Sequence, residues 1–443
     1  MESLLGEAFT WVEGEPSLRP GVTLTAAHMR TLARTSALDA SPGGARARLA
    51  IRAAAAALGA FPASIANFYA ARGAGEVAGF TVPAVNIRGL TFDIASALFR
   101  AIIAEESIAI FEINRAELGF TGQDAESFAC SVLAAAIAEG YRGPVFLQAD
   151  HMIVNAKAFA ADPAAELSAL RAVIESCLDA SFLNVDIDAS TVVDLSFADV
   201  ASQQRENAEV TATLARGVRA WQAEHSAIRQ SVEISLGGEI GEVGAHNSTV
   251  EELDSFVEQT HALYPGAHLR KISVQTGTKH GGVVLPDGAM ADVSLDFNTL
   301  RDLSAAARQR YGMAGAVQHG ASTLPEAMFG RFPEVGTAEV HLATGFQNLV
   351  FDHPRFPPDL LREMEAYALT KLGQDRRPGE SDAQFLHLAR RKLWGPFQAS
   401  LWEIEAEPLV EIRESLTSRF RALMRSLRAS GLRPAVEGYT RPA

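Results

Sequence analysis

Eight short apolar segments, spaced along residues 81–343 and separated by segments of helical pattern, constrain this chain more than any other feature. Short apolar runs that alternate with helices are typical of a parallel α/β fold, in which the strands are buried on both faces. Eight such units in a row match the size of a (β/α)₈ TIM barrel. The expected strands are Thr81–Ile87, Ile108–Asn114, Pro144–Gln148, Phe182–Ile187, Ser231–Leu236, Ile272–Thr276, Gly315–Gln318 and Ala338–Ala343.

The segments on either side of the barrel pattern are helical. A doubly wound open sheet is the alternative fold, but no glycine-rich dinucleotide fingerprint follows the first expected strand. Residues 1–78 should form an N-terminal helical extension, because Ala45–Leu58 is rich in strong helix formers. Residues 79–353 should form the barrel, and helical periodicity after a proline cluster predicts a C-terminal helical annex over residues 354–443.

The composition and net charge limit the kinds of molecule that this chain is expected to bind. Hydrophobic residues make up 48% of the chain, charged residues 21%, and the formal net charge is −14. This charge argues against nucleic-acid binding but permits small anionic substrates. No apolar run reaches the ~18 residues of a transmembrane helix, and the N-terminus lacks the basic region of a signal peptide. We therefore expect a cytoplasmic protein without membrane or nucleic-acid partners, with Cys130 and Cys177 as buried free thiols.

Polar side chains gather where the expected strands end. His151, His280 and His319 follow the third, sixth and seventh strands. The carboxyl ends of barrel strands meet at one face, and three histidines with an open position form a catalytic metal site. Zinc fits an all-imidazole site best, while Mn, Fe and Co are compatible. Asp150, directly before one of these histidines, could either orient the metal site or act as an acid/base.

At this point several motifs resemble the class II, metal-dependent fructose-bisphosphate aldolases, within the wider ketose-bisphosphate aldolase family. The resemblance runs from Val82 to Gln347. It is carried by VPAVNI, QADH, GTKHGG with the downstream LDF, HGAST and VHLATGFQ. It implies that the three histidines ligate a divalent metal and that Asp150 moves the proton on the substrate's C4 hydroxyl. It also implies that Gly281, Gly320, Ser322 and Thr344 hold a substrate phosphate, with Asn86 and Asn114 near the substrate pocket.

The departures from the family pattern are equally specific. Two glutamates usually stand on the fifth strand, whereas here the pair is Glu233 and Ser235, which leaves Glu233 as the candidate fourth metal ligand. The family usually has His where Gln148 stands and Asn where His341 stands. Glu242, in a glycine-rich loop, is the candidate for a second acid/base.

A lysine that usually follows the second metal histidine is missing from this chain. The cations that could neutralise a phosphate are therefore sought elsewhere, first at Lys157, Arg115 and Lys279. A second phosphate could be met by the annex, in this or a neighbouring subunit, through Arg390, Arg391 and Lys392.

The resemblance implies reversible cleavage of fructose 1,6-bisphosphate to dihydroxyacetone phosphate and glyceraldehyde 3-phosphate. Tagatose 1,6-bisphosphate or another phosphorylated ketose is an alternative substrate, because no residue distinguishes C4 epimers. A Schiff-base aldolase using Lys279 or Lys271 is a second alternative. A third is a non-catalytic subunit that stabilises another aldolase. The long annex makes a homo-oligomer the expected assembly.

Overall fold

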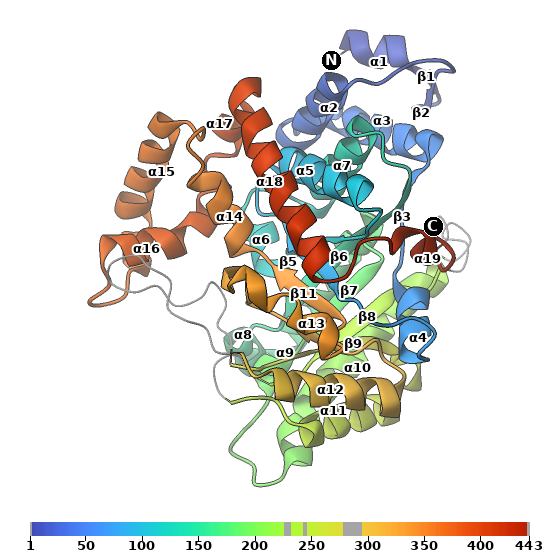
Figure 1. The fold of residues 1–443 in the computed structure, drawn as a ribbon, viewed down its shortest axis with the longest axis vertical. Coiled ribbons are helices and arrows are strands. Elements are labelled where there is room, and N and C mark those ends of the chain that lie inside the picture. The colour runs from blue at the N-terminus through green and yellow to red at the C-terminus, as the bar shows by residue number, and fades with distance from the viewer. Residues whose placement is uncertain (1, 226–231, 242–245, 278–294, 441–443) are drawn as a thin grey trace.

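The computed structural model describes residues 2–225, 232–241, 246–277 and 295–440, which fold around a closed barrel of eight parallel strands (Figure 1). Each barrel strand pairs with the next one along the sequence, and the last pairs with the first to close the cylinder. The expected TIM barrel is therefore confirmed. Its strands are β4 (Val82–Asn86), β5 (Ile110–Asn114), β6 (Gly143–Ile153), β7 (Asn184–Asp188), β8 (Ser235–Glu239), β9 (Leu269–Val274), β10 (Ala316–Gln318) and β11 (Glu339–Leu342).

Helices cover the outside of the barrel, and local signals set where they begin. In α9, for example, Asp162 caps the first turn and Pro163 occupies the first helical position, where a missing N–H costs nothing. The helices between and after the barrel strands are α5 (Thr91–Ala104), α6 (Arg115–Phe120), α7 (Ala125–Ala138), α8 (Ala156–Ala161), α9 (Pro163–Asp179), α10 (Val200–Glu224), α11 (Val250–Leu263), α12 (Phe297–Tyr311), α13 (Arg331–Glu334) and α14 (Thr344–Phe351).

The N-terminal segment is mainly helical and also contains strands that the sequence pattern did not predict. Its hairpin pairs β1 with β2, and β3 adds to the first residues of β6. The expected boundaries between the N-terminal extension, the barrel and the C-terminal annex stay a prediction. The N-terminal elements are α1 (Glu2–Ala8), β1 (Phe9–Val12), β2 (Glu15–Leu18), α2 (Ala26–Leu38), α3 (Pro42–Leu58), β3 (Ala60–Pro62) and α4 (Ala66–Gly73).

The C-terminal helices lie across the barrel helices and reach the N-terminal segment (Figure 1). The longest of them, α18, packs on α5, where the Thr417 hydroxyl donates to the carbonyl of Ala97. Near the N-terminal helices, Arg30 donates to the carbonyl of Trp402 at 3.2 Å. The C-terminal elements are α15 (Pro358–Lys371), α16 (Asp382–Ala389), the 3₁₀ turn η6 (Arg390–Lys392), α17 (Gln398–Trp402), α18 (Ala406–Ser426) and α19 (Arg433–Glu437).

Strand β8 is displaced along the sequence from its expected position. It begins at Ser235 and runs through two glycines, whereas the expected strand ended at Leu236. The barrel interior requires these glycines, because a Cβ on Gly237 would lie 2.3 Å from an oxygen of Asp186. Glycine was interpreted as the end of a strand, yet here it marks a close approach inside one. The displacement changes which glutamate reaches the carboxyl end of the barrel.

Strand β6 is longer than expected and is irregular where it passes the histidine. Its pairing with β7 shifts register between Ala149 and Met152. Within this bulge, His151 has a φ of +40°, a left-handed conformation that a non-glycine residue adopts at a cost. Bulges redirect a side chain that regular alternation would place elsewhere. The bulge therefore sets the direction of the His151 ring.

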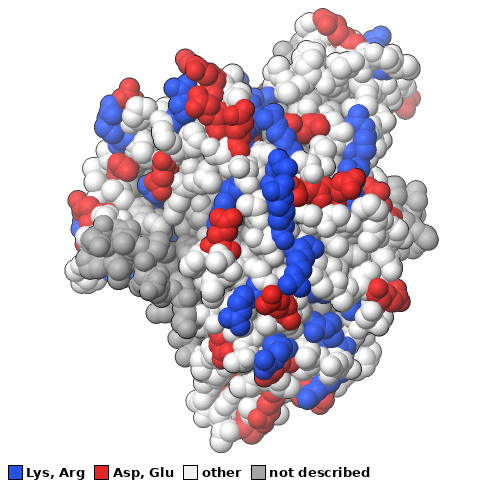
Figure 2. Space-filling model, viewed as in Figure 1, with Lys and Arg blue, Asp and Glu red and all other residues white. Residues whose placement is uncertain are grey.

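The surface and the thiols agree with the composition. Within the described part of the chain, no helix is long and apolar enough to cross a membrane. On the face drawn in Figure 2, basic side chains are interspersed with acidic ones. Arg421 and Arg425 of α18, for example, pair with Glu105. Cys130 and Cys177 are free and buried, which confirms the prediction of unpaired thiols.

Candidate active site

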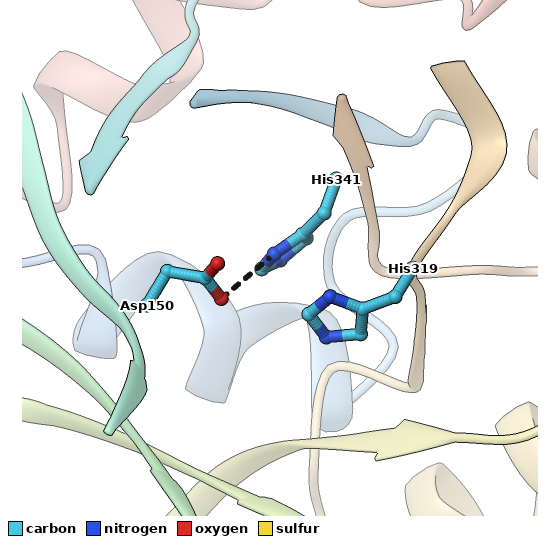
Figure 3. A group of neighbouring side chains, drawn as sticks. All are labelled: Asp150, His319 and His341. Atoms are coloured by element: carbon cyan, nitrogen blue, oxygen red, sulfur yellow. Dashed lines mark hydrogen bonds and ion pairs between the residues drawn. The ribbon is translucent and has the colours of Figure 1, made fainter. Parts of the chain in front are cut away.

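Three histidines and an aspartate meet at the carboxyl end of the barrel. His151 lies near the end of β6, His319 follows β10, and His341 lies in β11. The ring centroids of His151 and His319 are 4.0 Å apart, and those of His319 and His341 are 4.2 Å apart. In Figure 3, the His341 ring points at the Asp150 carboxylate, with the His319 ring beside them. His280 lies outside the described residues.

Two carboxylates hold the His151 ring. Its Nδ1 lies 3.1 Å from an oxygen of Asp188 and 3.1 Å from one of Glu239. Burial alone would lower the pKa of His151, but the charges of Glu239 and Asp150 and the hydrogen bond to Asp188 raise it well above its usual value. A carboxylate on one ring nitrogen is the usual way to orient a histidine that ligates a metal through the other nitrogen.

The donor set fits a divalent metal. Ligand atoms of His151, Glu239 and His319 all lie within 4.8 Å of one another, and all three side chains are largely buried. Burial, together with the neighbouring Asp188 charge, raises the pKa of Glu239 to about 7, so its negative charge is poorly compensated in this arrangement. Imidazole nitrogens with a carboxylate oxygen are ligands that zinc and related cations accept. A cation at this point would compensate the buried charge.

The expectation that Glu233 joins the metal ligands is wrong. Glu233 precedes β8, and Arg270 near the start of β9 binds both of its carboxylate oxygens, at 2.9 and 2.8 Å. Both residues therefore lie at the amino end of the barrel, opposite the histidines. Glu239, at the carboxyl end of β8, lies beside His151 instead, because the strand ends three residues beyond its expected end at Leu236.

Asp150 is a buried carboxylate fixed by His341. His341 Nδ1 lies 3.1 Å from Asp150 Oδ1, and its Nε2 lies 2.8 Å from Glu339 Oε2. Burial would raise the pKa of Asp150, but the charges of His151 and His341 outweigh it and hold that pKa below its usual value. Asp150 is therefore ionised near neutral pH and can accept a proton.

Charged side chains also lie in the interior of the barrel, around Lys271. Lys271, with 1% of its surface exposed, donates to Gln148 Oε1 at 2.7 Å and Glu339 Oε2 at 2.5 Å, and it pairs with Asp186 at 2.9 Å. Although burial disfavours its charge, the two carboxylates raise the pKa of Lys271. A Schiff-base lysine needs a lowered pKa instead. Lys271 is thus a structural cation, and Lys279 lies outside the described residues.

One cavity at this end of the barrel collects most of the described candidates. Asp150, His151 and His319 line it together with five residues expected to contact substrate: Asn86, Asn114, Gly320, Ser322 and Thr344. The side-chain amide oxygen of Asn86, Oδ1, is buried and has no hydrogen-bond partner within the described residues. Lys157 is exposed on α8 and does not line this cavity. Gly281 and Glu242 lie outside the described residues.

Sequence reasoning missed two charged residues of this cavity. Arg88 lies two residues after the end of β4, and Glu112 lies within β5. Burial and the charge of Asp150 raise the pKa of Glu112 well above its usual value. The sequence indicated both residues. Burying a charged side chain in or next to an apolar strand is costly, so such a residue is a candidate for a functional role.

Three of the six cations considered for phosphate binding are paired with carboxylates. Arg115 binds Glu166 and donates to the carbonyl of Ile153. Arg390 pairs with Asp352 at 2.6 Å, and Lys392 pairs with Asp375 at 2.8 Å.

The sequence and the fold were compared with known proteins. A sequence profile described as fructose-bisphosphate aldolase class-II matches residues 73–378, more than half of the chain. No curated protein matches the sequence.

Solved structures of similar fold include a probable tagatose 6 phosphate kinase from Sinorhizobium meliloti 1021. It is 17% identical, with a TM-score of 0.52 over 81% of this chain and 97% of that one. Fructose-bisphosphate aldolase from Campylobacter jejuni is 20% identical, with a TM-score of 0.48 over 82% and 93%. The YdjI aldolase from Escherichia coli K12 is 15% identical, with a TM-score of 0.45 over 82% and 97%.

Proposed function

The chain belongs to the class-II fructose-bisphosphate aldolase family, a family of metal-dependent lyases, and from that membership we propose that its substrate is fructose 1,6-bisphosphate. Cleavage between C3 and C4 would yield dihydroxyacetone phosphate and glyceraldehyde 3-phosphate. The observation that carries the proposal is the buried Asp150 carboxylate, 3% exposed and 3.1 Å from His341 Nδ1, in one cavity with His151 and His319. A buried base beside a cluster of metal-type ligands is what a retro-aldol cleavage requires.

The proposed metal ligands are His151, His280 and His319, with Glu239 in the place first given to Glu233. Zinc is the preferred ion, and Mn, Fe or Co would be accepted by the same donors. A divalent cation there supplies a Lewis acid that polarises the substrate carbonyl and stabilises the negative charge that develops during cleavage. Asp188 orients the His151 ring through Nδ1.

The protein's own groups carry the proton transfers. Asp150 accepts the proton of the C4 hydroxyl as the C3–C4 bond breaks, and the electron pair of that bond stays on C3. His341, held by Glu339, keeps the Asp150 carboxylate in place. Glu242 is the proposed group that then protonates C3. In condensation Asp150 returns its proton to the new C4 hydroxyl.

The remaining cavity residues suit a phosphorylated ketose. Hydroxyls of Ser322 and Thr344 and the backbone at Gly320 are proposed to bind one phosphate, and Asn86 and Asn114 to contact substrate hydroxyls. The buried side-chain oxygen Oδ1 of Asn86 has no hydrogen-bond partner within the described residues. It supports this role, because a substrate hydroxyl could donate a hydrogen bond to it. A homo-oligomeric assembly and a cytoplasmic location stay predictions.

A cleavage assay with metal analysis tests the proposal. The wild type is expected to cleave fructose 1,6-bisphosphate faster than tagatose 1,6-bisphosphate. The Asp150→Asn variant should keep its metal but lose roughly 10²–10⁴-fold in kcat, the usual contribution of a general base. Faster cleavage of the tagatose ester would reassign the substrate. A metal-loaded wild type that cleaves neither ester would favour a non-catalytic subunit.

A further inference from the structure

Arg88 lines the cavity that also holds Asp150 and His319. Arg88 Nε binds Glu117 Oε1 at 2.6 Å, which fixes one edge of the guanidinium. Its Nη1 lies 3.5 Å from the Thr344 hydroxyl, and Thr344 and Ser322 line the same cavity. The Nη edge of Arg88 therefore lies beside the Thr344 hydroxyl, in the cavity that Ser322 also lines. A planar guanidinium edge next to hydroxyl donors is suited to a phosphate group.

The C-terminal annex holds this arginine in place. Trp394, with 1% of its surface exposed, donates from Nε1 to Gln347 Oε1 at 3.0 Å, and the same oxygen lies 3.3 Å from Arg88 Nη1. The Trp394 ring also packs on the residue after Arg88, because a Cβ on Gly89 would lie only 2.2 Å from it. Phe351 supports the ring from another side, with centroids 4.6 Å apart. The Arg88 backbone and side chain thus both depend on Trp394.

The annex also brings a second guanidinium to this place. Arg391 lies in η6, three residues before Trp394, and its neighbours in η6 are engaged elsewhere. Burial and the positive charge of Arg88 lower the pKa of Arg391, and the charges of Glu117 and Asp375 oppose this. Arg391 therefore lies near enough to Arg88 for their like charges to act on each other. An anion bound between them would relieve that repulsion.

We propose that the annex completes the active site: Trp394 positions Arg88, and Arg88 with Arg391 binds a phosphate of the substrate at the cavity mouth. This inference rests on the proposed aldolase function for the identity of the substrate. The matched family profile ends at residue 378, so Arg391 and Trp394 lie beyond the part of the chain that family membership explains. The phosphate oxygens would accept hydrogen bonds from the two guanidiniums, and the hydroxyls of Ser322 and Thr344 would be further donors.

Binding of inorganic phosphate to the full-length protein tests the arginines without any turnover. Calorimetry should show that Arg88→Gln weakens phosphate binding by about tenfold or more, as loss of a charge-assisted hydrogen bond would. Because Arg88 also pairs with Glu117, the more exposed Arg391→Gln serves as the second variant and should weaken binding by about threefold. The matched control is Arg362→Gln, which removes the same charge from an exposed position on α15 and should change binding less than twofold.

A positioning role for Trp394 predicts a split between kinetic constants. Trp394→Phe keeps an aromatic ring but loses the N–H that holds Gln347. In the folded protein it should raise KM several-fold and leave kcat nearly unchanged. Wild-type phosphate affinity in both Arg88→Gln and Arg391→Gln, or an equal loss in Arg362→Gln, would overturn the inference. Phosphate binding that depends on these arginines in a protein without aldolase activity would leave it standing and refute only the proposed function.

Discussion

The buried lysine inside the barrel gives the sharpest prediction on stability. In Lys271→Met, a side chain of similar volume replaces the ammonium group but leaves Asp186 and Glu339 buried. Glu339 keeps hydrogen bonds from Tyr69 and His341, whereas the ion pair with Lys271 is the only one recorded for Asp186 within the described residues. The variant therefore strands one buried carboxylate almost completely.

The size of the effect follows from that loss. Removing one partner of a buried ion pair costs about 3–5 kcal/mol. With an unfolding entropy of about 2.1 cal/mol/K per residue, a chain of 443 residues should melt about 3–5 °C lower. Burial already raises the pKa of Asp186 to about 6, and loss of Lys271 raises it further. A carboxyl with a raised pKa binds its proton more tightly in the folded state, so the defect should shrink as the pH falls from 8 to 5.5.

Differential scanning calorimetry at both pH values measures this effect. Arg301→Met, which breaks the exposed pair between Arg301 and Asp302 at 3.0 Å, is the control and should shift the melting temperature by less than about 1 °C. The double variant Lys271→Met, Asp186→Asn should recover part of the loss, because it removes the stranded charge. A Lys271→Met protein that melts like the wild type at pH 8 would refute the reasoning. Retained cleavage activity in this variant is also expected, and its complete loss in folded protein would revive the Schiff-base alternative.

Three further predictions concern the metal. Glu239→Gln should weaken zinc binding by about 10-fold or more, as measured by competition with a chromophoric chelator, whereas Glu233→Gln should leave it unchanged. Zinc affinity should fall as the pH drops below about 7, because Glu239, whose pKa is raised to about 7, then holds a proton that the metal must displace; a flat pH profile from 8 to 5.5 would contradict this. Zinc at about 100 times its Kd should stabilise the folded protein by about 2.7 kcal/mol, and a melting temperature unchanged by EDTA would speak against a site formed on folding.

The barrel was predictable because parallel strands buried on both faces leave a simple record in the sequence. Val82–Asn86 and Ile110–Asn114 fall within the expected segments, as apolar runs between helical ones must. The same pattern gave the wrong position for β8, because Gly237 and Gly238 were interpreted as the beginning of a glycine-rich loop. Only the three-dimensional packing against Asp186 and Phe256 explains glycine within that strand.

The candidate site was partly predictable for a related reason. Strand ends converge in a barrel, so the positions of His151 and His319 in the sequence already implied that they meet. Glu239 could not be assigned, because its role depends on where β8 ends. The contact of Trp394 with the segment that carries Arg88 joins residues some 300 positions apart, and no local pattern encodes such a contact.

The central claim is that His151 and His319, with Glu239, surround a divalent cation at the carboxyl end of the barrel. Anomalous diffraction from zinc-loaded crystals tests it most directly. The account predicts one strong peak about 2.0–2.2 Å from a ring nitrogen of each histidine and beside the Glu239 carboxylate. A zinc-loaded crystal with no peak between these side chains, or with its peak at Glu233, would contradict it.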